Sequence, residues 1–193
     1  MNAKEIALII VFASLAIVLN PAISGIGFPF LFTGFIYNVW EIVIMVAFLL
    51  MGFKGGISVA VLNAAFLLLV YPGPSRALFP LTNTLPVFGM MVGIYIASKI
   101  TRKNSQEHSP SKAREITLYT ALAIVFRLIV ALPMVYTLLH FHIGATPPSE
   151  SAIFMIALPL QTFYNVTITL YTVPIAYFIA KIVSKNMEIG TTV

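Results

Sequence analysis

Residues 116–139 read ITLYTALAIVFRLIVALPMVYTLL, an apolar segment with a single charged residue, Arg127, near its middle. The rise from Ile116 to Arg127 in a helix is roughly 16 Å, about half of a ~30 Å hydrocarbon core. A guanidinium at that depth is costly and cannot lose its charge, so it should contact protein, water or ligand rather than lipid. Arg127 therefore either pairs with an acidic group and joins two helices, or lines a polar pocket for a small solute.

The composition of the whole chain also indicates a membrane protein. Of the 193 residues, 60% are hydrophobic and only 9% are charged, which is typical of an integral membrane protein. A soluble protein of this size would leave most of that apolar surface uncovered. We expect one membrane domain, residues 1–193. The absence of cysteine excludes disulfides and thiolate metal sites, and we expect no cofactor.

The chain contains six apolar segments, some of them short, and they predict an all-α bundle of six transmembrane helices. The first segment is also compatible with a signal peptide, because Ala22-x-Ser24 fits a small-x-small cleavage site. An even bundle favours a retained helix. The predicted spans are approximately residues 5–19, 36–53, 57–70, 79–98, 116–139 and 160–182.

The connections between these segments differ in character. Pro21–Gly34 is apolar and rich in glycine and proline, so it is either an ordered outer loop that covers the bundle as a lid or a connection along the lipid surface. Gly52–Gly56 and Tyr71–Arg76 are predicted turns. Thr101–Arg114 is hydrophilic, and His140–Ser149 forms the last loop.

Basic residues gather on one side of a six-span chain. Nine of the eleven fall there, which predicts by the positive-inside rule that both termini are cytoplasmic in a multi-pass protein of the cell membrane. The net charge of +5 is thus explained without a nucleic-acid partner. The nine are Lys4, Lys54, Lys99, Arg102, Lys103, Lys112, Arg114, Lys181 and Lys185.

Polar residues within the apolar segments cluster toward the predicted outer half. Glu41 is the best acidic partner for Arg127, and Asn38 lies three residues before it on the same helix face. The neighbouring Trp40 favours a membrane interface at this end. Asn63 is predicted to make an interhelical hydrogen bond or to line a pocket.

The two later spans carry further polar positions. Pro80, Asn83, Thr84 and Pro86 make the start of the fourth span irregular, and a proline within a span frees carbonyl groups that need a partner, so Thr82–Pro86 is a candidate pocket wall.

On the last span, Gln161, Asn165, Thr169 and Thr172 recur at helical spacing and form a polar stripe. A metal site at His140-x-His142 is not expected, because no third ligand is evident.

Several stretches resemble the substrate-binding S components of energy-coupling factor (ECF) vitamin transporters. They are the Lys-x-Ile-Ala-Leu start at Lys4, Tyr37-Asn-Val-Trp-Glu41-Ile-Val-Ile, Phe48-Leu-Leu-Met-Gly-Phe-Lys-Gly-Gly56, Leu62-Asn63 and Tyr71-Pro-Gly73. The stretch from Phe126-Arg127 to Leu132-Pro133-Met-Val-Tyr136 is similar to the fifth helix of the riboflavin-type members. The family's Ala-x-x-x-Ala contact pattern is present only as Ala3 and Ala7.

The resemblance implies capture of a vitamin from outside, under the first loop and against helices four to six. It also implies a transmembrane coupling subunit and a pair of cytoplasmic ATPases as partners, with Ala3, Ala7 and Ser14 as candidate coupling contacts. Riboflavin is the first choice of substrate, because aromatic residues offer stacking surfaces and amides could bind a ring edge. The candidate substrate-binding residues are Asn38, Trp40, Glu41, Asn63, Asn83, Thr84, Arg127, Tyr136, Gln161 and Asn165.

Two other classes of protein are considered. An intramembrane enzyme would need a nucleophile–base or metal constellation, and the chain has neither His-x-x-x-His nor any Asp, so we expect no enzymatic activity. In a structural or assembly subunit without a ligand, an Arg127–Glu41 pair would only join helices. The chain has no phosphate-binding G-x-x-x-x-G-K-[ST] loop and so could not power transport alone.

Overall fold

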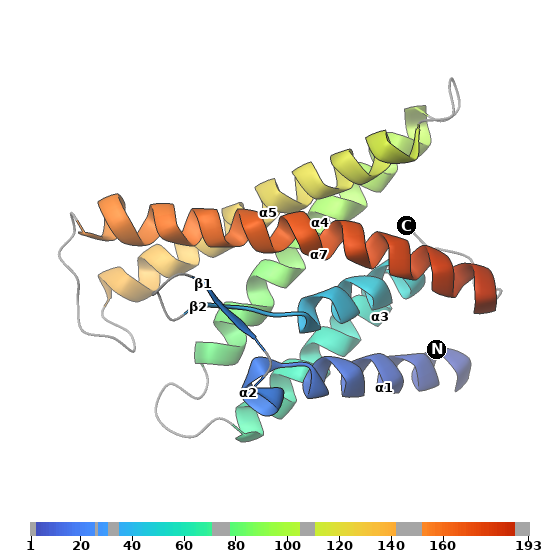
Figure 1. The fold of residues 1–193 in the computed structure, drawn as a ribbon, viewed down its shortest axis with the longest axis horizontal. Helices are drawn as coiled ribbons and strands as arrows, with labels where there is room; N and C mark the ends of the chain where they lie inside the picture. Colours follow the sequence, from blue (N-terminus) through green and yellow to red (C-terminus); the bar gives the residue numbers. More distant parts are fainter. Residues whose placement is uncertain are drawn as a thin grey trace.

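The computed structural model describes residues 3–25, 27–30, 35–70, 78–104, 111–141 and 152–187. These residues form long helices and one small β-hairpin (Figure 1). The elements are α1 (Ala3–Val18), α2 (Pro21–Ser24), β1 (Phe28–Phe30), β2 (Phe35–Tyr37), α3 (Trp40–Val70), α4 (Leu78–Asn104), α5 (Lys112–His140), the π-helix η2 (Ile153–Ala157) and α7 (Leu158–Met187).

The predicted all-α membrane architecture is confirmed at the level of helix length and composition. Four helices in the described part of the chain are long and apolar enough to cross a membrane. They are Trp40–Val70, Pro80–Lys103, Lys112–His140 and Ile153–Asn186. The helix α1 has 16 residues.

The boundary predicted for the second segment is wrong at its start. Residues 36 and 37 belong to strand β2, and the helix begins at Trp40. The segments predicted separately as 36–53 and 57–70 are joined in α3, whose helical geometry is interrupted at Gly52 (φ 70°, ψ −162°). This left-handed conformation is open to glycine because glycine has no Cβ.

The chain doubles back at Gly52. A Cβ at Gly56 would lie 3.1 Å from the Cα of Phe48, whereas eight residues of straight helix span about 12 Å. The two arms of α3 therefore diverge from a sharp bend, as Figure 1 shows. The turn predicted at Gly52–Gly56 is confirmed.

The apolar connection after α1 is partly ordered structure. Asn20 caps α2 by accepting a 3.1 Å hydrogen bond from Ala22 N, and Gly25 ends it with φ 66°. The strands β1 and β2 then pair antiparallel, with Phe28 opposite Tyr37. The hairpin was not predicted.

Several predicted connections lie wholly or partly outside the described residues. Residues 31–34 of the first loop, the turn Tyr71–Arg76, and residues 105–110 and 142–149 belong to this group. His142 is among them.

The buried core lies where the first arm of α3 meets α4 and α7. Ile44, Phe48, Met91 and Ile94 are fully buried there. The helices α4 and α5 pack closely because α4 presents Gly89 and Gly93, and a Cβ at Gly89 would lie 2.6 Å from Phe126 O. The close-packing face predicted at Gly89-x-x-x-Gly93 is thus confirmed.

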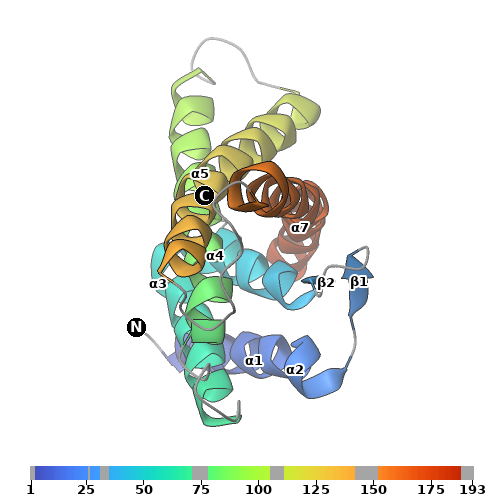
Figure 2. The same ribbon diagram turned by 90° about the vertical axis from the view of Figure 1, so that its left-hand side faces the viewer.

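The arrangement of the elements separates two ends of the molecule. The start of α1, the bend in α3, the end of α4, the start of α5 and the end of α7 lie toward the right of Figure 1, whereas the hairpin and the start of α7 lie toward the left. In Figure 2, α1 lies below the first arm of α3, and the hairpin lies beside α7; α1 packs against α3. The segments that carry the predicted cytoplasmic basic residues therefore share one end.

Candidate functional site

The guanidinium of Arg127 pairs with the carboxylate of Glu41. Both side chains are 3% exposed, although one comes from α5 and the other from the first turn of α3. Arg127 donates from Nη1 to Oε2 and from Nη2 to Oε1, the latter over 3.2 Å. Such a two-pronged pair satisfies both charges away from lipid. The acidic partner predicted for Arg127 is therefore the one observed.

Two further helices contact the same guanidinium. Its Nε donates to Asn165 Oδ1 of α7 over 2.6 Å, and its Nη1 lies 3.1 Å from Met90 Sδ of α4. Asn165 in turn donates from Nδ2 to Gln161 O over 2.8 Å. Arg127 thus joins α3, α4, α5 and α7 at a single buried point.

The polar stripe predicted on the last span faces this cluster at Asn165. Thr169 donates to Asn165 O over 2.7 Å and also lies 3.6 Å from Met90 Sδ. Thr172 is fully buried further along α7. The stripe therefore runs from the arginine into the packed core.

Several buried polar atoms have no hydrogen-bond partner within the described part of the chain. An unsatisfied buried polar group costs about 1–3 kcal/mol, so such groups usually indicate water or a ligand. They are Asn38 Oδ1, both amide atoms of Asn63, Thr84 Oγ1, Gln161 Oε1 and Thr172 Oγ1.

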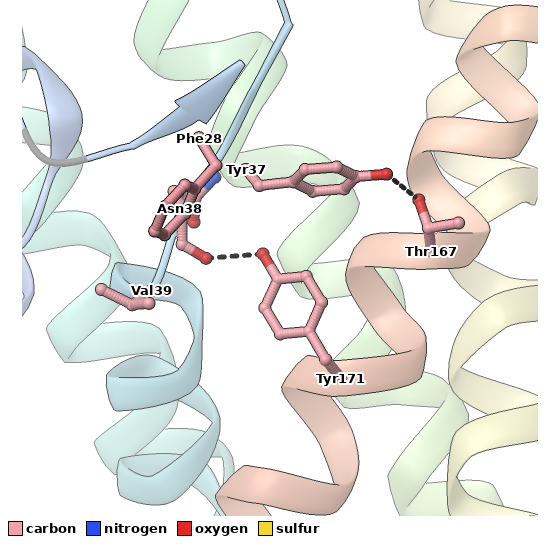
Figure 3. A pocket seen from close by; sticks show the side chains of 6 residues that line it. All are labelled: Phe28, Tyr37, Asn38, Val39, Thr167 and Tyr171. Atoms are coloured by element: carbon pink, nitrogen blue, oxygen red, sulfur yellow. Dashed lines mark hydrogen bonds between the residues drawn. The ribbon is translucent and has the colours of Figure 1, made fainter. Parts of the chain in front are cut away.

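A pocket of about 480 Å³ opens between the hairpin and α7. Figure 3 shows the side chains that surround it, which come from β1, from β2 and the two residues that follow it, and from α7. This volume lies in the range of small-molecule sites, which are mostly apolar with a few polar groups. The lining residues are Phe28, Tyr37, Asn38, Val39, Thr167 and Tyr171.

Three tyrosine hydroxyls fasten the hairpin side of the pocket to α7. Tyr37 Oη lies 2.7 Å from Thr167 Oγ1, and Tyr171 donates to Asn38 O over 2.6 Å; Figure 3 draws both bonds. Tyr164 donates to Ile36 O over 2.9 Å, and its ring stacks on Tyr37 at 5.6 Å. These bonds hold β2 and Asn38 against α7.

Asn38 connects the pocket with the buried ion pair. It lines the pocket, and its Nδ2 donates to Glu41 Oε1 over a long 3.5 Å. The side chain is 8% exposed. Asn38 would therefore lie between a ligand in the pocket and the Glu41–Arg127 pair.

The structure brings five of the ten candidate binding residues together: Asn38, Glu41, Arg127, Gln161 and Asn165. It places the other five elsewhere or leaves them without a described role at the site. Trp40 is 2% exposed and packs in the core rather than at a membrane interface. Asn63 is buried in the second arm of α3.

The remaining candidates lie on α4 and α5. The irregular start predicted for the fourth span is absent, since α4 is continuous through Pro86. Asn83 is half-buried there and Thr84 is buried. Tyr136 lies near the end of α5, where its ring stacks on His140 at 5.4 Å.

Sequence reasoning did not select most of the pocket lining. Thr167 and Tyr171 lie on α7 beside the polar stripe, and Tyr164 precedes them by a helical interval, so extending the stripe to the neighbouring threonine and tyrosines would have found them. Phe28–Phe30 and Phe35–Tyr37 are apolar, partly aromatic runs separated by four residues that include Gly34, which is a usable hairpin signal.

The small residues predicted to contact a coupling subunit are exposed. Ala3, Ala7 and Ser14 lie on the open side of α1, while Ala13 and Ala16 are buried. No group of three potential metal ligands occurs among the described residues. Comparison of the chain with models of protein families, with curated proteins and with solved structures found no match.

Proposed function

We propose that this chain is the substrate-binding membrane subunit of an ECF-type importer. It captures a vitamin from outside, with riboflavin as the first choice, and releases it inward together with a transmembrane coupling subunit and a pair of cytoplasmic ATPases. The proposal treats the two arms of α3 as separate passes and α1 as another, which gives six spans with both termini in the cytoplasm. The one-sided distribution of basic residues supports this orientation.

The observation that carries the proposal is the pocket between the hairpin and α7. The hairpin that forms one of its walls lies away from the basic end of the molecule (Figure 1). The pocket is linked through Asn38 to a buried polar cluster, and polar groups inside membrane helices commonly mark solute sites. The quoted resemblance to S components in the sequence supports the same function.

The exposed face of α1 supports the coupling part of the proposal. Ala7 and Ser14 are exposed there, and small residues allow another membrane helix to approach closely. The candidate contact with the coupling subunit is therefore Ala3, Ala7 and Ser14.

The test is to purify the full chain in mild detergent and to record its absorbance and the masses of released compounds. A yellow preparation that releases a flavin supports both class and substrate. Release of another vitamin keeps the class and discards riboflavin. If no compound is released and no vitamin in a panel raises the unfolding temperature, the proposed function is wrong.

A second candidate is a structural or assembly subunit without a transported ligand. It is favoured by the Arg127 contacts, because a guanidinium that joins four helices is sufficient to explain its burial. The same purification separates the two candidates.

A further inference from the structure

The described residues that line the pocket carry no charge. Phenylalanine, valine, threonine, asparagine and tyrosine make up the six lining side chains. A charged ligand that entered would lose hydration without meeting an opposite charge on the wall, which is unfavourable. The walls therefore already distinguish neutral from charged solutes.

The nearby Glu41–Arg127 ion pair does not make the pocket more favourable for a charged ligand. Both carboxylate oxygens of Glu41 accept from Arg127, and the Arg127 Nε is occupied by Asn165. An anion would have to displace Glu41, and a cation would have to displace Arg127. Either exchange would leave a buried charge unpaired.

The pocket offers rings and a hydrogen-bond acceptor instead. Phe28, Tyr37 and Tyr171 supply aromatic surface. Asn38 Oδ1 belongs to a side chain that is more than nine-tenths buried, and it has no partner in the described chain. This oxygen is itself shut off from solvent, so a ligand N–H or O–H would reach and satisfy it once the Asn38 side chain turned toward the pocket.

We infer that this pocket selects an uncharged, largely aromatic metabolite that donates a hydrogen bond to Asn38, and that it rejects the phosphorylated or carboxylated counterparts of such a compound. The inference rests on the proposed function, because it names the chemical class of substrate that the site captures.

The test compares probes that share a ring and differ in charge. Riboflavin is paired with riboflavin 5′-phosphate, and nicotinamide with nicotinate, and each is titrated by calorimetry into the purified full-length protein. We expect the neutral member of a pair to bind at least tenfold more tightly than its charged counterpart. Equal or tighter binding of the charged member overturns the inference and leaves the proposed function standing. Binding of no probe, here and across a vitamin panel, overturns both.

A lysine introduced into the pocket wall tests whether the ligand binds in this pocket. Thr167→Lys puts an ammonium on the pocket, and Thr162→Lys is the matched control, since Thr162 is another half-buried threonine of α7 whose hydroxyl also donates to the carbonyl four residues earlier. We expect Thr167→Lys alone to shift the preference at least tenfold toward riboflavin 5′-phosphate. Val39→Lys, also on the wall, serves if Thr167→Lys does not fold. An unchanged preference in the folded wall variant, or the same shift in the control, overturns the inference.

Discussion

At the scale of single residues, Arg127 determines most of what surrounds it. Its charge is matched by Glu41, and its remaining donors reach Asn165 and Met90. A buried ion pair is weak evidence of stability, because desolvation can cancel the attraction, but breaking one partner is strongly destabilising. The pair therefore specifies which helix faces meet, whatever its net contribution to stability.

We expect Arg127→Met to lower the free energy of unfolding by about 3–5 kcal/mol, because it leaves the Glu41 carboxylate buried without a counter-charge. The measurement is thermal unfolding in detergent, followed by size-exclusion chromatography of the surviving protein. The double variant Glu41→Leu/Arg127→Met should recover most of the loss, since no charge remains. A double variant as unstable as the single one would contradict this account of the pair.

Asn165 provides a second test at this scale. Asn165→Leu removes the acceptor of the Arg127 Nε and should cost about 1–3 kcal/mol, whereas Asn165→Asp keeps an oxygen for the guanidinium. Equilibrium unfolding of the two variants in parallel measures the difference. Equal stability of Asn165→Leu and wild type would show that this hydrogen bond contributes nothing net.

Much of this cluster could be predicted from the sequence, and the reason is physical. Few charges occur in the apolar segments, so Arg127 and Glu41 had almost no other partners, and Asn165 stood out on an apolar helix. The pocket tyrosines were harder to select. The roles of Tyr37 in β2 and of Tyr171 in α7 depend on contacts between residues more than 120 positions apart.

At the scale of elements, Gly52 turns one helical sequence into two arms. Its φ of 70° with ψ of −162° lies in a region that is essentially restricted to glycine. We expect Gly52→Ala to lower the free energy of unfolding by about 1–3 kcal/mol. Thermal unfolding checks this, with Ile57→Ala at an exposed position of the same helix as the control. A Gly52→Ala protein as stable as the control would contradict the strain argument.

The sequence predicted the long helices better than the hairpin. Long apolar runs admit few interpretations, and helices α4, α5 and α7 extend only a few residues beyond the predicted spans. Strands of three residues are too short to show an alternating pattern, and β1 contains Pro29. Their pairing, and the bonds from Tyr164 and Tyr171, are tertiary contacts that local preference does not contain.

At the scale of the whole molecule, the absence of cysteine makes the proposed orientation directly testable. Lys112→Cys and Phe141→Cys place single thiols at exposed positions at opposite ends of α5. We expect a membrane-impermeant maleimide to label Phe141→Cys in intact cells and Lys112→Cys only after lysis. The reverse pattern would invert the orientation, and labelling of both in intact cells would contradict a membrane-spanning α5.

The composition predicted a membrane protein, but it did not predict how the hairpin and the helices pack against one another. A chain that is 60% hydrophobic has to be placed in lipid, but nothing in the segments shows that the hairpin lies against α7 rather than over α4 and α5. The hydroxyls of Tyr164 and Tyr171 donate to the carbonyls of Ile36 and Asn38, and these hydrogen bonds fix the hairpin against α7.

The close approach of α4 and α5 has a consequence for how this chain can evolve. A Cβ at Gly89 or Gly93 would collide with the backbone of α5, at Phe126 and Leu122 respectively, and backbone cannot rotate away as a side chain can. Neither Gly89 nor Gly93 can therefore be replaced by another amino acid unless the facing helix moves. In related proteins that keep this packing, the spacing Gly-x-x-x-Gly should be retained even where the surrounding apolar residues have been exchanged. The spacing would then help to identify distant relatives with the same fold.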